Sequence, residues 1–257
     1  MPERKVSIVT GASSGIGAAI AEDLAQAGCN IVVNFSSNQE GGEAVARACR
    51  EYGVEAIAQR GDISANSDCQ AVVNTALDKW GRLDVLVNNA GVTRFADAAD
   101  LNALESGDFE TVFAVNVVGC YQMCKAAAPE LRKTSGAIVN ISSHAGFSGI
   151  GSSIAYAASK GAVNTMTLSL ARSLAPHVRV NAVCPGFVDT DWMVPKLAGK
   201  DLAEFKQETA RIAPLQRVVT PQEVAEATRW FALQGKSITG QLLVIDGGTH
   251  LTVGAPL

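Results

Sequence analysis

Short apolar runs rich in β-branched residues recur along the chain and alternate with longer amphipathic stretches. The runs have the length and composition of buried strands, and the stretches between them have helical spacing. The predicted strands are Val6–Val9, Asn30–Val33, Glu55–Ala58, Leu83–Val87, Ala137–Ile141, Val178–Val183 and Leu242–Ile245. The predicted helices are Ala18–Ala27, Glu43–Tyr52, Asp68–Trp80, Phe109–Leu131, Ala157–Leu174 and Glu223–Leu233. Strands that alternate with helices predict a parallel sheet covered on both faces, and the nearly continuous apolar strands agree with burial on both sides.

The alternation continues along the whole chain without a compositional break or a repeat of 20–50 residues. We therefore expect one domain over residues 1–257, a length that a single α/β domain accommodates. One segment, Phe187–Pro214, departs from the alternation, because it is long and mixed in polarity. This is typical of a loop that covers a binding site, so we expect a substrate lid within about 187–214.

The composition excludes several classes of protein. With 47% hydrophobic and 18% charged residues, the chain buries a large core and is not a disordered polypeptide. The net charge is only −4 and lysines and arginines do not cluster, so no nucleic-acid partner is expected. No stretch approaches the ~20 apolar residues of a membrane span, and residues 1–10 lead into the first strand without the features of a secretory signal. The six cysteines lack zinc-site spacing, so we expect a reduced, cytoplasmic protein without a metal.

A glycine-rich turn follows the first predicted strand and opens the first predicted helix, where residues 10–17 read TGASSGIG. Glycines in this context permit a tight turn and let the backbone approach a pyrophosphate at the helix N-terminus. The spacing G-x-x-x-G-x-G differs from the commoner G-x-G-x-x-G, and a purely structural turn is the alternative interpretation. The residues expected to bind a dinucleotide here are Gly11, Ser13, Ser14, Gly15, Ile16 and Gly17.

Two further strand ends carry polar or small residues. Asp62 and Ile63 follow the third strand, where the carboxylate would meet an adenine amino group; a turn or helix N-cap is the alternative for Asp62. Asn89, Ala90 and Gly91 follow the fourth strand, and the carboxyl ends of parallel strands form the crevice where open α/β sheets bind ligands. A bare turn is the alternative for this second segment.

Four residues later in the chain have the properties of a proton-transfer site. Tyr156 and Lys160 share one helix face at i,i+4 spacing, and a nearby cation favours the phenolate of a tyrosine that otherwise titrates near ~10. Ser143, thirteen residues upstream, ends a strand and would hydrogen-bond a substrate oxygen. Asn116 is unfavourable inside a helix, which favours a local role such as holding a water. Each residue alone has a structural explanation, but together after a dinucleotide motif they indicate hydride transfer between a nicotinamide cofactor and a carbonyl or alcohol.

The chain at this point resembles the short-chain dehydrogenase/reductase superfamily, in its short single-domain branch. The resemblance rests on TGASSGIG (10–17), GDIS (61–64), NNAG (88–91), VNVVG (115–119), ISS (141–143), YAASK (156–160), CPGFVDT (184–190) and IDGG (245–248). It implies a three-layer, doubly wound (Rossmann) parallel sheet of seven strands with helices on both faces, and no metal.

The resemblance also implies roles for individual residues. Asn116, Ser143, Tyr156 and Lys160 would form a catalytic tetrad, in which Lys160 binds the nicotinamide ribose and Asn116 orders a water in a proton relay. Ser142 competes with Ser143, but the thirteen-residue interval to Tyr156 matches the family for Ser143. The residues that would flank the nicotinamide carboxamide are Pro185, Gly186, Val188 and Thr190.

Cofactor preference depends on residues 34–38, which follow the second strand and read NFSSN. Enzymes that use NAD usually place a carboxylate here for the ribose hydroxyls, and none is present. We therefore expect NADP, with NAD as the alternative, because no carboxylate repels the 2′-phosphate. Basic residues that commonly hold this phosphate are also missing, since Ser14 stands where many NADP enzymes carry arginine; Asn34, Ser36 and Ser37 are the expected polar ligands.

The substrate pocket is predicted to be apolar, with one imidazole. Its candidate residues, besides Ser143 and Tyr156, are His144, Phe147, Ile150, Phe187, Trp192 and Met193, and core or lid packing is the alternative for each. The substrate class expected from the proton-transfer site is a ketone or secondary alcohol. Within the family the chain resembles 3-oxoacyl-carrier-protein reductases and sugar or polyol dehydrogenases, although Thr134 and His177 replace basic residues expected to dock a carrier. A 3-oxoacyl-carrier-protein reductase and a catalytically silent dinucleotide-binding sensor are the alternative functions.

Two predicted helices, Phe109–Leu131 and Ala157–Leu174, are apolar over more of their circumference than one sheet face requires. The resemblance implies that they pair with their equivalents in a four-helix bundle, and that the closing segment Leu242–Leu257 meets another subunit across a second axis. Two such isologous contacts generate a homotetramer with 222 symmetry, with a dimer as the alternative.

Overall fold

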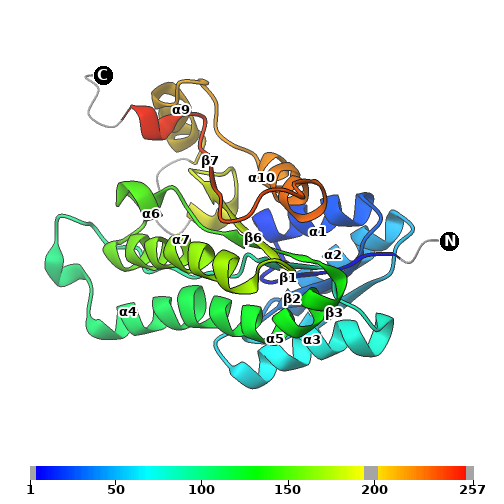
Figure 1. The fold of residues 1–257 in the computed structure, drawn as a ribbon. Helices are drawn as coiled ribbons and strands as arrows, with labels where there is room; N and C mark the ends of the chain where they lie inside the picture. Colours follow the sequence, from blue (N-terminus) through cyan, green and yellow to red (C-terminus); the bar gives the residue numbers. More distant parts are fainter. Residues whose placement is uncertain (1–3, 194–201, 253–257) are drawn as a thin grey trace.

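A parallel sheet forms the centre of the computed structural model, which describes residues 4–193 and 202–252 (Figure 1). Within these residues the sheet has seven strands in the order β3-β2-β1-β4-β5-β6-β7. The strands are β1 (Val6–Val9), β2 (Asn30–Phe35), β3 (Ala56–Arg60), β4 (Val85–Asn88), β5 (Ala137–Ile141), β6 (Arg179–Pro185) and β7 (Leu242–Ile245). Strand order reverses between β1 and β4, and ligands of open α/β sheets bind at the carboxyl ends of the strands at such a switch point.

Helices cover both faces of the sheet, and the predicted three-layer Rossmann fold is confirmed (Figure 1). One layer contains α1 (Gly15–Gln26), α2 (Gln39–Glu51) and α10 (Pro221–Arg229). The other contains α3 (Asn66–Trp80), α4 (Ser106–Phe113), α5 (Cys120–Thr134) and α7 (Ile154–Leu174). Successive residues of β1 point to opposite layers, since Val9 belongs to the core under α1 and Ile8 to the core under α5.

The predicted strands and helices are found with small shifts at their ends. The helix predicted over Phe109–Leu131 is interrupted by a π-helical turn, η2 (Ala114–Gly119), which contains Asn116. Two helices were not predicted, the single turn α6 (Ala145–Ser148) and α9 (Leu202–Ile212). Shorter elements are η1 (Leu101–Ala103), η3 (Asp191–Met193), η4 (Trp230–Gln234) and η5 (Thr249–Leu251). Among the helices of the described ranges, none is long and apolar enough to cross a membrane.

The described parts of the predicted lid lie beyond β6, where Figure 1 shows α9 near β7. Phe187 and Phe205 pack edge to face with ring centroids 5.1 Å apart, and Lys206 forms an ion pair with Asp189. These contacts attach α9 to the segment that follows β6. Residues 194–201 of the predicted lid lie outside the described residues, as does the side chain of Met193.

Candidate active site

The glycine turn between β1 and α1 is too tight for side chains at two positions. Gly11 has φ +60°, and a Cβ at Gly17 would lie 2.4 Å from the oxygen of Gly11. Ser14 precedes α1 without capping it through its side chain in the part of the chain that the structure describes. The first amides of α1 therefore stay open to a ligand, and an anion such as a pyrophosphate is the ligand that a helix N-terminus favours.

Thr10, which follows β1, and Asn89, which follows β4, hold this turn in place. The Thr10 hydroxyl accepts hydrogen bonds from the main-chain amides of Asn89 and Ala90, both at 3.0 Å. The Asn89 side chain donates to the main-chain oxygens of Thr10 and Gly11, also at 3.0 Å. The Asn89 amide thus supports the glycine turn, and the predicted contact of Asn89 with a nucleotide stays a prediction.

Asn34 is likewise directed away from solvent, with 1% of its surface exposed. Its amide nitrogen donates to the main-chain oxygens of Gln59 and Gly61 at 3.3 and 3.0 Å, and its oxygen accepts from Gly11 N at 3.4 Å. The Asn34 side chain lies inside the sheet, because β2 continues to Phe35. The predicted contact of Asn34 with the cofactor stays a prediction. Ser36 and Ser37, which follow the strand, are exposed as predicted.

The Asp62 side chain stabilises a turn, which was the alternative to a cofactor contact at this position. Its carboxylate accepts hydrogen bonds from the main-chain amide and the hydroxyl of Ser64 at 2.9 and 2.8 Å. Ile63 is buried, and a Cβ at Gly119 would lie 2.9 Å from the Ile63 side chain. The predicted contact of Asp62 with an adenine stays a prediction.

Tyr156 and Lys160 lie in the first turns of α7, which Ser153 caps by accepting a hydrogen bond from Tyr156 N at 3.2 Å. Lys160 Nζ lies 5.5 Å from the centre of the Tyr156 ring and donates to the main-chain oxygen of Ile141 at 2.9 Å. Burial lowers the pKa of Lys160 to about 8. Burial also raises the pKa of Tyr156 to about 12, against the opposing effect of a hydrogen bond with Ser143. The expected lowering of the tyrosine pKa by Lys160 is not found, since burial raises this pKa and Ser143 is the group that opposes the rise.

Ser142 and Ser143 have different partners at the end of β5. The Ser142 hydroxyl donates to Lys160 O at 3.1 Å and to the Asn164 side chain at 2.6 Å, so it is engaged inside the fold. The Ser143 hydroxyl accepts from Ala145 N at 3.1 Å and donates to Pro185 O at 3.4 Å. It also lies close enough to the Tyr156 phenol to lower the pKa of that group. Ser143 is thus the serine that the structure brings to the phenol.

Asn116 joins three segments of the site through its side chain. Its oxygen accepts from Val92 N at 2.8 Å, and its nitrogen donates to Val92 O and to the Ser159 hydroxyl, both at 3.0 Å. A Cβ at Gly91 would lie 3.3 Å from the Asn116 oxygen and 3.7 Å from Lys160 Nζ. The side-chain atoms of Asn116 therefore already have hydrogen-bond partners in the protein. The predicted role of Asn116, to order a water, would fall to its main-chain atoms.

The segment after β6 approaches the glycine turn. A Cβ at Gly15 would lie 3.5 Å from the Thr190 methyl group, so Thr190 lies over the start of α1. A Cβ at Gly186 would lie 2.5 Å from the Asp246 Cβ, which restricts this position to glycine. Pro185 is buried at the end of β6, and Val188 is held by bridge pairing with Val219. The four residues predicted to flank a nicotinamide therefore line the same edge of the sheet as the tetrad.

The candidate substrate residues are only partly brought together. The Trp192 ring centroid lies 6.5 Å from that of Tyr156, so this side chain reaches the proposed proton donor. Phe187 packs on α9 through Phe205. Phe147 lines a shallow groove of about 390 Å³ between α6 and α7, and Ile150 is exposed beside α6.

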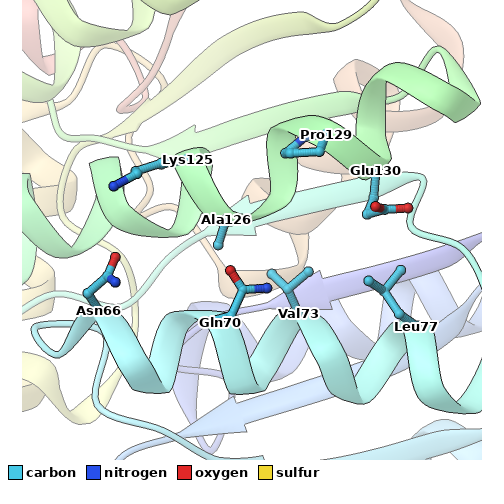
Figure 2. Close-up of a pocket in the computed structure, with 8 residues that line it drawn as sticks. All are labelled: Asn66, Gln70, Val73, Leu77, Lys125, Ala126, Pro129 and Glu130. Carbon is cyan, nitrogen blue, oxygen red and sulfur yellow. The ribbon is translucent and has the colours of Figure 1, made fainter.

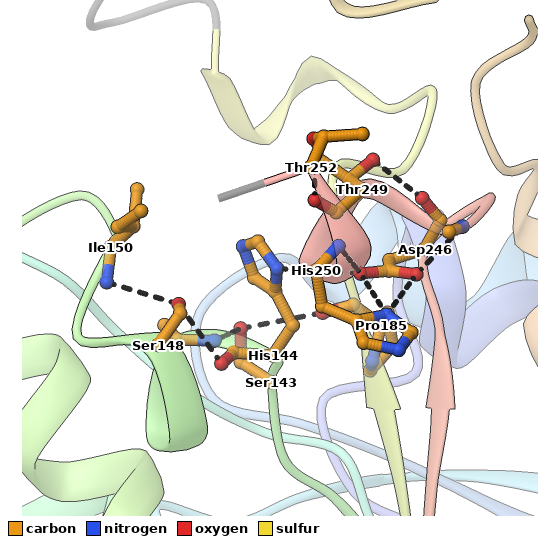
Figure 3. Close-up of polar contacts among 11 residues, drawn as sticks. Ser143, His144, Ser148, Ile150, Pro185, Asp246, Thr249, His250 and Thr252 are labelled. Carbon is orange, nitrogen blue, oxygen red and sulfur yellow. Dashed lines mark hydrogen bonds and ion pairs between the residues drawn. The ribbon is translucent and has the colours of Figure 1, made fainter. Parts of the chain in front are cut away.

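His144 lies next to Ser143 and belongs to a cluster that was not predicted (Figure 3). Asp246 accepts from His250 Nδ1 at 2.9 Å, and His144 Nδ1 lies 3.6 Å from the same carboxylate. Burial lowers the pKa of His144, and the Asp246 carboxylate opposes this effect. Burial raises the pKa of Asp246, but hydrogen bonds from His250 and Gly248 outweigh it and leave the pKa below its usual value. The cluster ties the end of β7 to the loop that carries Ser143.

Another groove, of about 350 Å³, lies between α3 and α5 and is lined by the residues drawn in Figure 2. Gln70, Val73, Leu77, Lys125 and Pro129 are among them, and none of its lining residues belongs to the predicted tetrad. In the described ranges, no group of three or more histidine, cysteine, aspartate or glutamate side chains is arranged to hold a metal ion.

Comparisons with known proteins agree with this geometry. The short-chain dehydrogenase family profile matches residues 5–201. A protein of the granaticin polyketide synthase of Streptomyces violaceoruber, provisionally assigned as ketoacyl reductase 2, is 42% identical over 97% of this chain and 98% of its own length. The 3-oxoacyl-(acyl-carrier-protein) reductase of Synechocystis sp. is 38% identical over 95% of this chain and 96% of its own length.

A solved structure extends the similarity to the whole fold. The crystal structure of a provisionally assigned short-chain dehydrogenase/reductase from Burkholderia xenovorans is 40% identical and superposes with a TM-score of 0.90. The match covers 98% of this chain and 100% of that one. The chain therefore belongs to the short-chain dehydrogenase/reductase family and is an NAD(P)-dependent oxidoreductase acting on CH–OH groups.

Proposed function

We propose that this enzyme reduces a ketone with NADPH, using Tyr156 as the proton donor and Ser143, Lys160 and Asn116 as its supporting groups. The observation that carries the proposal is that Ser143, Tyr156 and Lys160 lie together at the carboxyl edge of the sheet: Ser143 lowers the pKa of the phenol, and Lys160 Nζ is 5.5 Å from the centre of its ring. This edge also carries the open glycine turn, so a bound dinucleotide and the phenol would share one crevice.

The protein residues supply the proton side of the reaction. Because the pKa of Tyr156 is raised to about 12, the phenol is protonated at neutral pH and is prepared to donate to a developing alkoxide. Ser143 would hydrogen-bond the same substrate oxygen and hold it beside Tyr156. When bound, the nicotinamide supplies the hydride.

Lys160 and Asn116 would support this proton transfer without donating to the substrate themselves. The buried ammonium of Lys160, 5% exposed, lies between the Tyr156 ring and β5, where it would also reach the ribose next to the nicotinamide. The Asn116 side chain forms hydrogen bonds with the Val92 backbone and with Ser159 of α7. These bonds connect η2, the segment after β4 and α7. The main-chain atoms of Asn116 would order a water through which the proton of Tyr156 is replaced.

The preference for NADPH rests on the loop after β2. Ser36 and Ser37 are exposed there and no carboxylate occupies residues 34–38, so nothing on this loop repels a 2′-phosphate. Because Asn34 is buried, its contribution would be indirect, through the glycine turn.

A 3-oxoacyl thioester is the substrate that the relatives favour. Proteins from Synechocystis sp. and Staphylococcus aureus with this similarity are named 3-oxoacyl-(acyl-carrier-protein) reductases. Trp192 beside Tyr156 and the apolar Phe187 would then contact the acyl chain. A catalytically silent sensor is disfavoured, because this chain contains all four residues of the predicted tetrad and belongs to a family of dehydrogenases.

We further propose that the enzyme is a homotetramer. Val118, Tyr121 and Leu168 are large apolar side chains that are about half exposed on η2, α5 and α7. Covering them requires a second copy of these helices, as in a four-helix interface.

The test is a substrate panel that follows nicotinamide absorbance with NADPH and NADH. The panel includes a 3-oxoacyl thioester on a small pantetheine mimic, the same acyl group on a carrier protein, cyclic ketones and sugar ketones. NADPH-dependent reduction of at least one ketone is expected. Binding of dinucleotide without turnover of any ketone or alcohol would contradict the proposed function.

A further inference from the structure

Arg60, the last residue of β3, places a guanidinium beside the loop that follows β2. The two strands pair in parallel with Phe35 opposite Arg60, so their ends lie side by side. Arg60 Nε donates to the main-chain oxygen of Ser36 at 3.2 Å. This hydrogen bond holds the guanidinium over the exposed residues Ser36 and Ser37.

The outer nitrogens of Arg60 are open to a ligand. Within residues 4–193 and 202–252, Arg60 forms no ion pair, and its only side-chain hydrogen bond uses Nε. Arg50 differs in this respect, because one of its terminal nitrogens donates to Ala56 O at 2.8 Å. A guanidinium fixed through Nε presents its two terminal nitrogens as a pair, which suits two oxygens of one phosphate.

The loop that Arg60 reaches also adjoins the glycine turn. A Cβ at Gly41 would lie 2.5 Å from the main-chain oxygen of Ser13, so the start of α2 touches the turn that would receive the pyrophosphate. In dinucleotide-binding folds the residues after the second strand contact the adenosine ribose, about 20 residues beyond the glycines. Ser36 and Ser37 occupy this position, and Arg60 contributes a cation to it from the neighbouring strand.

We propose that Arg60, together with the hydroxyls of Ser36 and Ser37, binds the ribose 2′-phosphate and determines the preference for NADP(H). The inference rests on the proposed function, since it assumes that the glycine turn receives a dinucleotide. It explains how the chain selects NADP(H) although Ser14 and residues 34–38 provide no basic side chain. The cation comes from Arg60 at the end of β3, 24 residues after Ser36 in sequence.

The test measures the dissociation constants of NADP⁺ and NAD⁺ by isothermal titration calorimetry, for the wild type, Arg60→Ala and Arg60→Lys. Arg60→Ala is expected to weaken NADP⁺ binding by about ten- to a hundredfold, while the affinity for NAD⁺ changes by less than about threefold. Arg60→Lys should recover part of the loss, because a point charge remains without the paired donors. Arg132→Ala is the matched control: it removes the same charge from the end of α5 and should change neither constant.

The two cofactors separate the possible failures. An equal loss for NADP⁺ and NAD⁺ would overturn the inference, because it would mean that Arg60 contacts the adenine or supports the loop. NADP⁺ binding that Arg60→Ala leaves unchanged would overturn it as well, while the proposed function would stand. A wild-type enzyme that binds neither dinucleotide would instead refute the proposed function itself.

Discussion

The ammonium of Lys160 is hydrogen-bonded to the main-chain oxygen of Ile141, 2.9 Å away, while it lies 5.5 Å from the centre of the Tyr156 ring. The lysine is therefore anchored to the end of β5, next to the strand residues that lead to Ser143. This contact joins α7 and β5 at the point where the proposed proton donor and its serine partner meet. It also buries a positive charge that has no carboxylate partner among the ion pairs of the described residues.

Burial of Lys160 predicts a pH-dependent stability. Its pKa in the folded protein is lowered to about 8, below the ordinary value of 10.5, so the unfolded chain binds more protons between these values. Its burial therefore costs stability below pH 8, and this cost is relieved as pH rises toward 10.5. In the wild type, this effect should raise the free energy of unfolding by about 2 kcal/mol between pH 7 and pH 9.5. In Lys160→Met, which has no group to titrate at this position, the increase should be absent.

Urea unfolding of the wild type and Lys160→Met at both pH values measures this difference. Other groups that titrate in the same range contribute equally to both proteins and cancel in the comparison. Identical pH dependence of the two proteins would show that Lys160 keeps an ordinary pKa.

A carboxylate on the loop after β2 is predicted to shift the cofactor preference. Ser36 is exposed at this position, so Ser36→Asp should repel a 2′-phosphate and lower the affinity for NADPH by about tenfold or more. The affinity for NADH should stay the same or rise. Asn34→Asp is a poorer test, because it removes the donor that holds Gln59 O and Gly61 O.

The ratio of kcat/KM for NADPH to that for NADH measures this shift. Ser67→Asp, in the first turn of α3, adds the same charge outside this loop and serves as the control. A wild-type enzyme that favours NADH by about tenfold or more would overturn the NADP assignment.

The exposed side chain of Leu168 predicts an interface on α7. It is 47% exposed, and Leu168→Glu would place a charge in the proposed four-helix contact without disturbing the core. Light scattering at micromolar concentration should give a mass of four chains of 26.7 kDa for the wild type and a smaller assembly for the variant. A wild-type mass near that of one chain would contradict the proposed tetramer.

The fold was predictable because its signals are local. Buried strands such as Val6–Val9 appear as continuous apolar runs, and the glycines that begin α1 are required by a turn with positive φ at Gly11. The choice between Ser142 and Ser143 needed the resemblance to the family at the sequence level, and the structure supports it because Ser142 is bonded to Asn164.

Other features depended on contacts between distant segments. From the sequence, Asn34 was expected to follow the second strand as a polar ligand. In the structure it lies within β2, and its amide donates to Gly61 O beside β3. Asn116 lies in a π-helical turn and forms hydrogen bonds to Val92 and Ser159, which helical periodicity does not reveal. The contact of Arg60 with Ser36 was not predictable from local sequence either, because only the parallel register with β2 brings the two residues together.

The role of Tyr156 as the proton donor is the central claim, and Tyr156→Phe tests it most directly. The substitution removes the hydroxyl and keeps the ring beside Trp192, so the dissociation constant for dinucleotide should stay within about twofold of the wild type. Single-turnover reduction of the best ketone from the substrate panel should slow by about 10²–10⁴-fold. A variant that binds dinucleotide normally and retains more than about a tenth of the wild-type rate, with chemistry rate-limiting, would show that Tyr156 is not the acid.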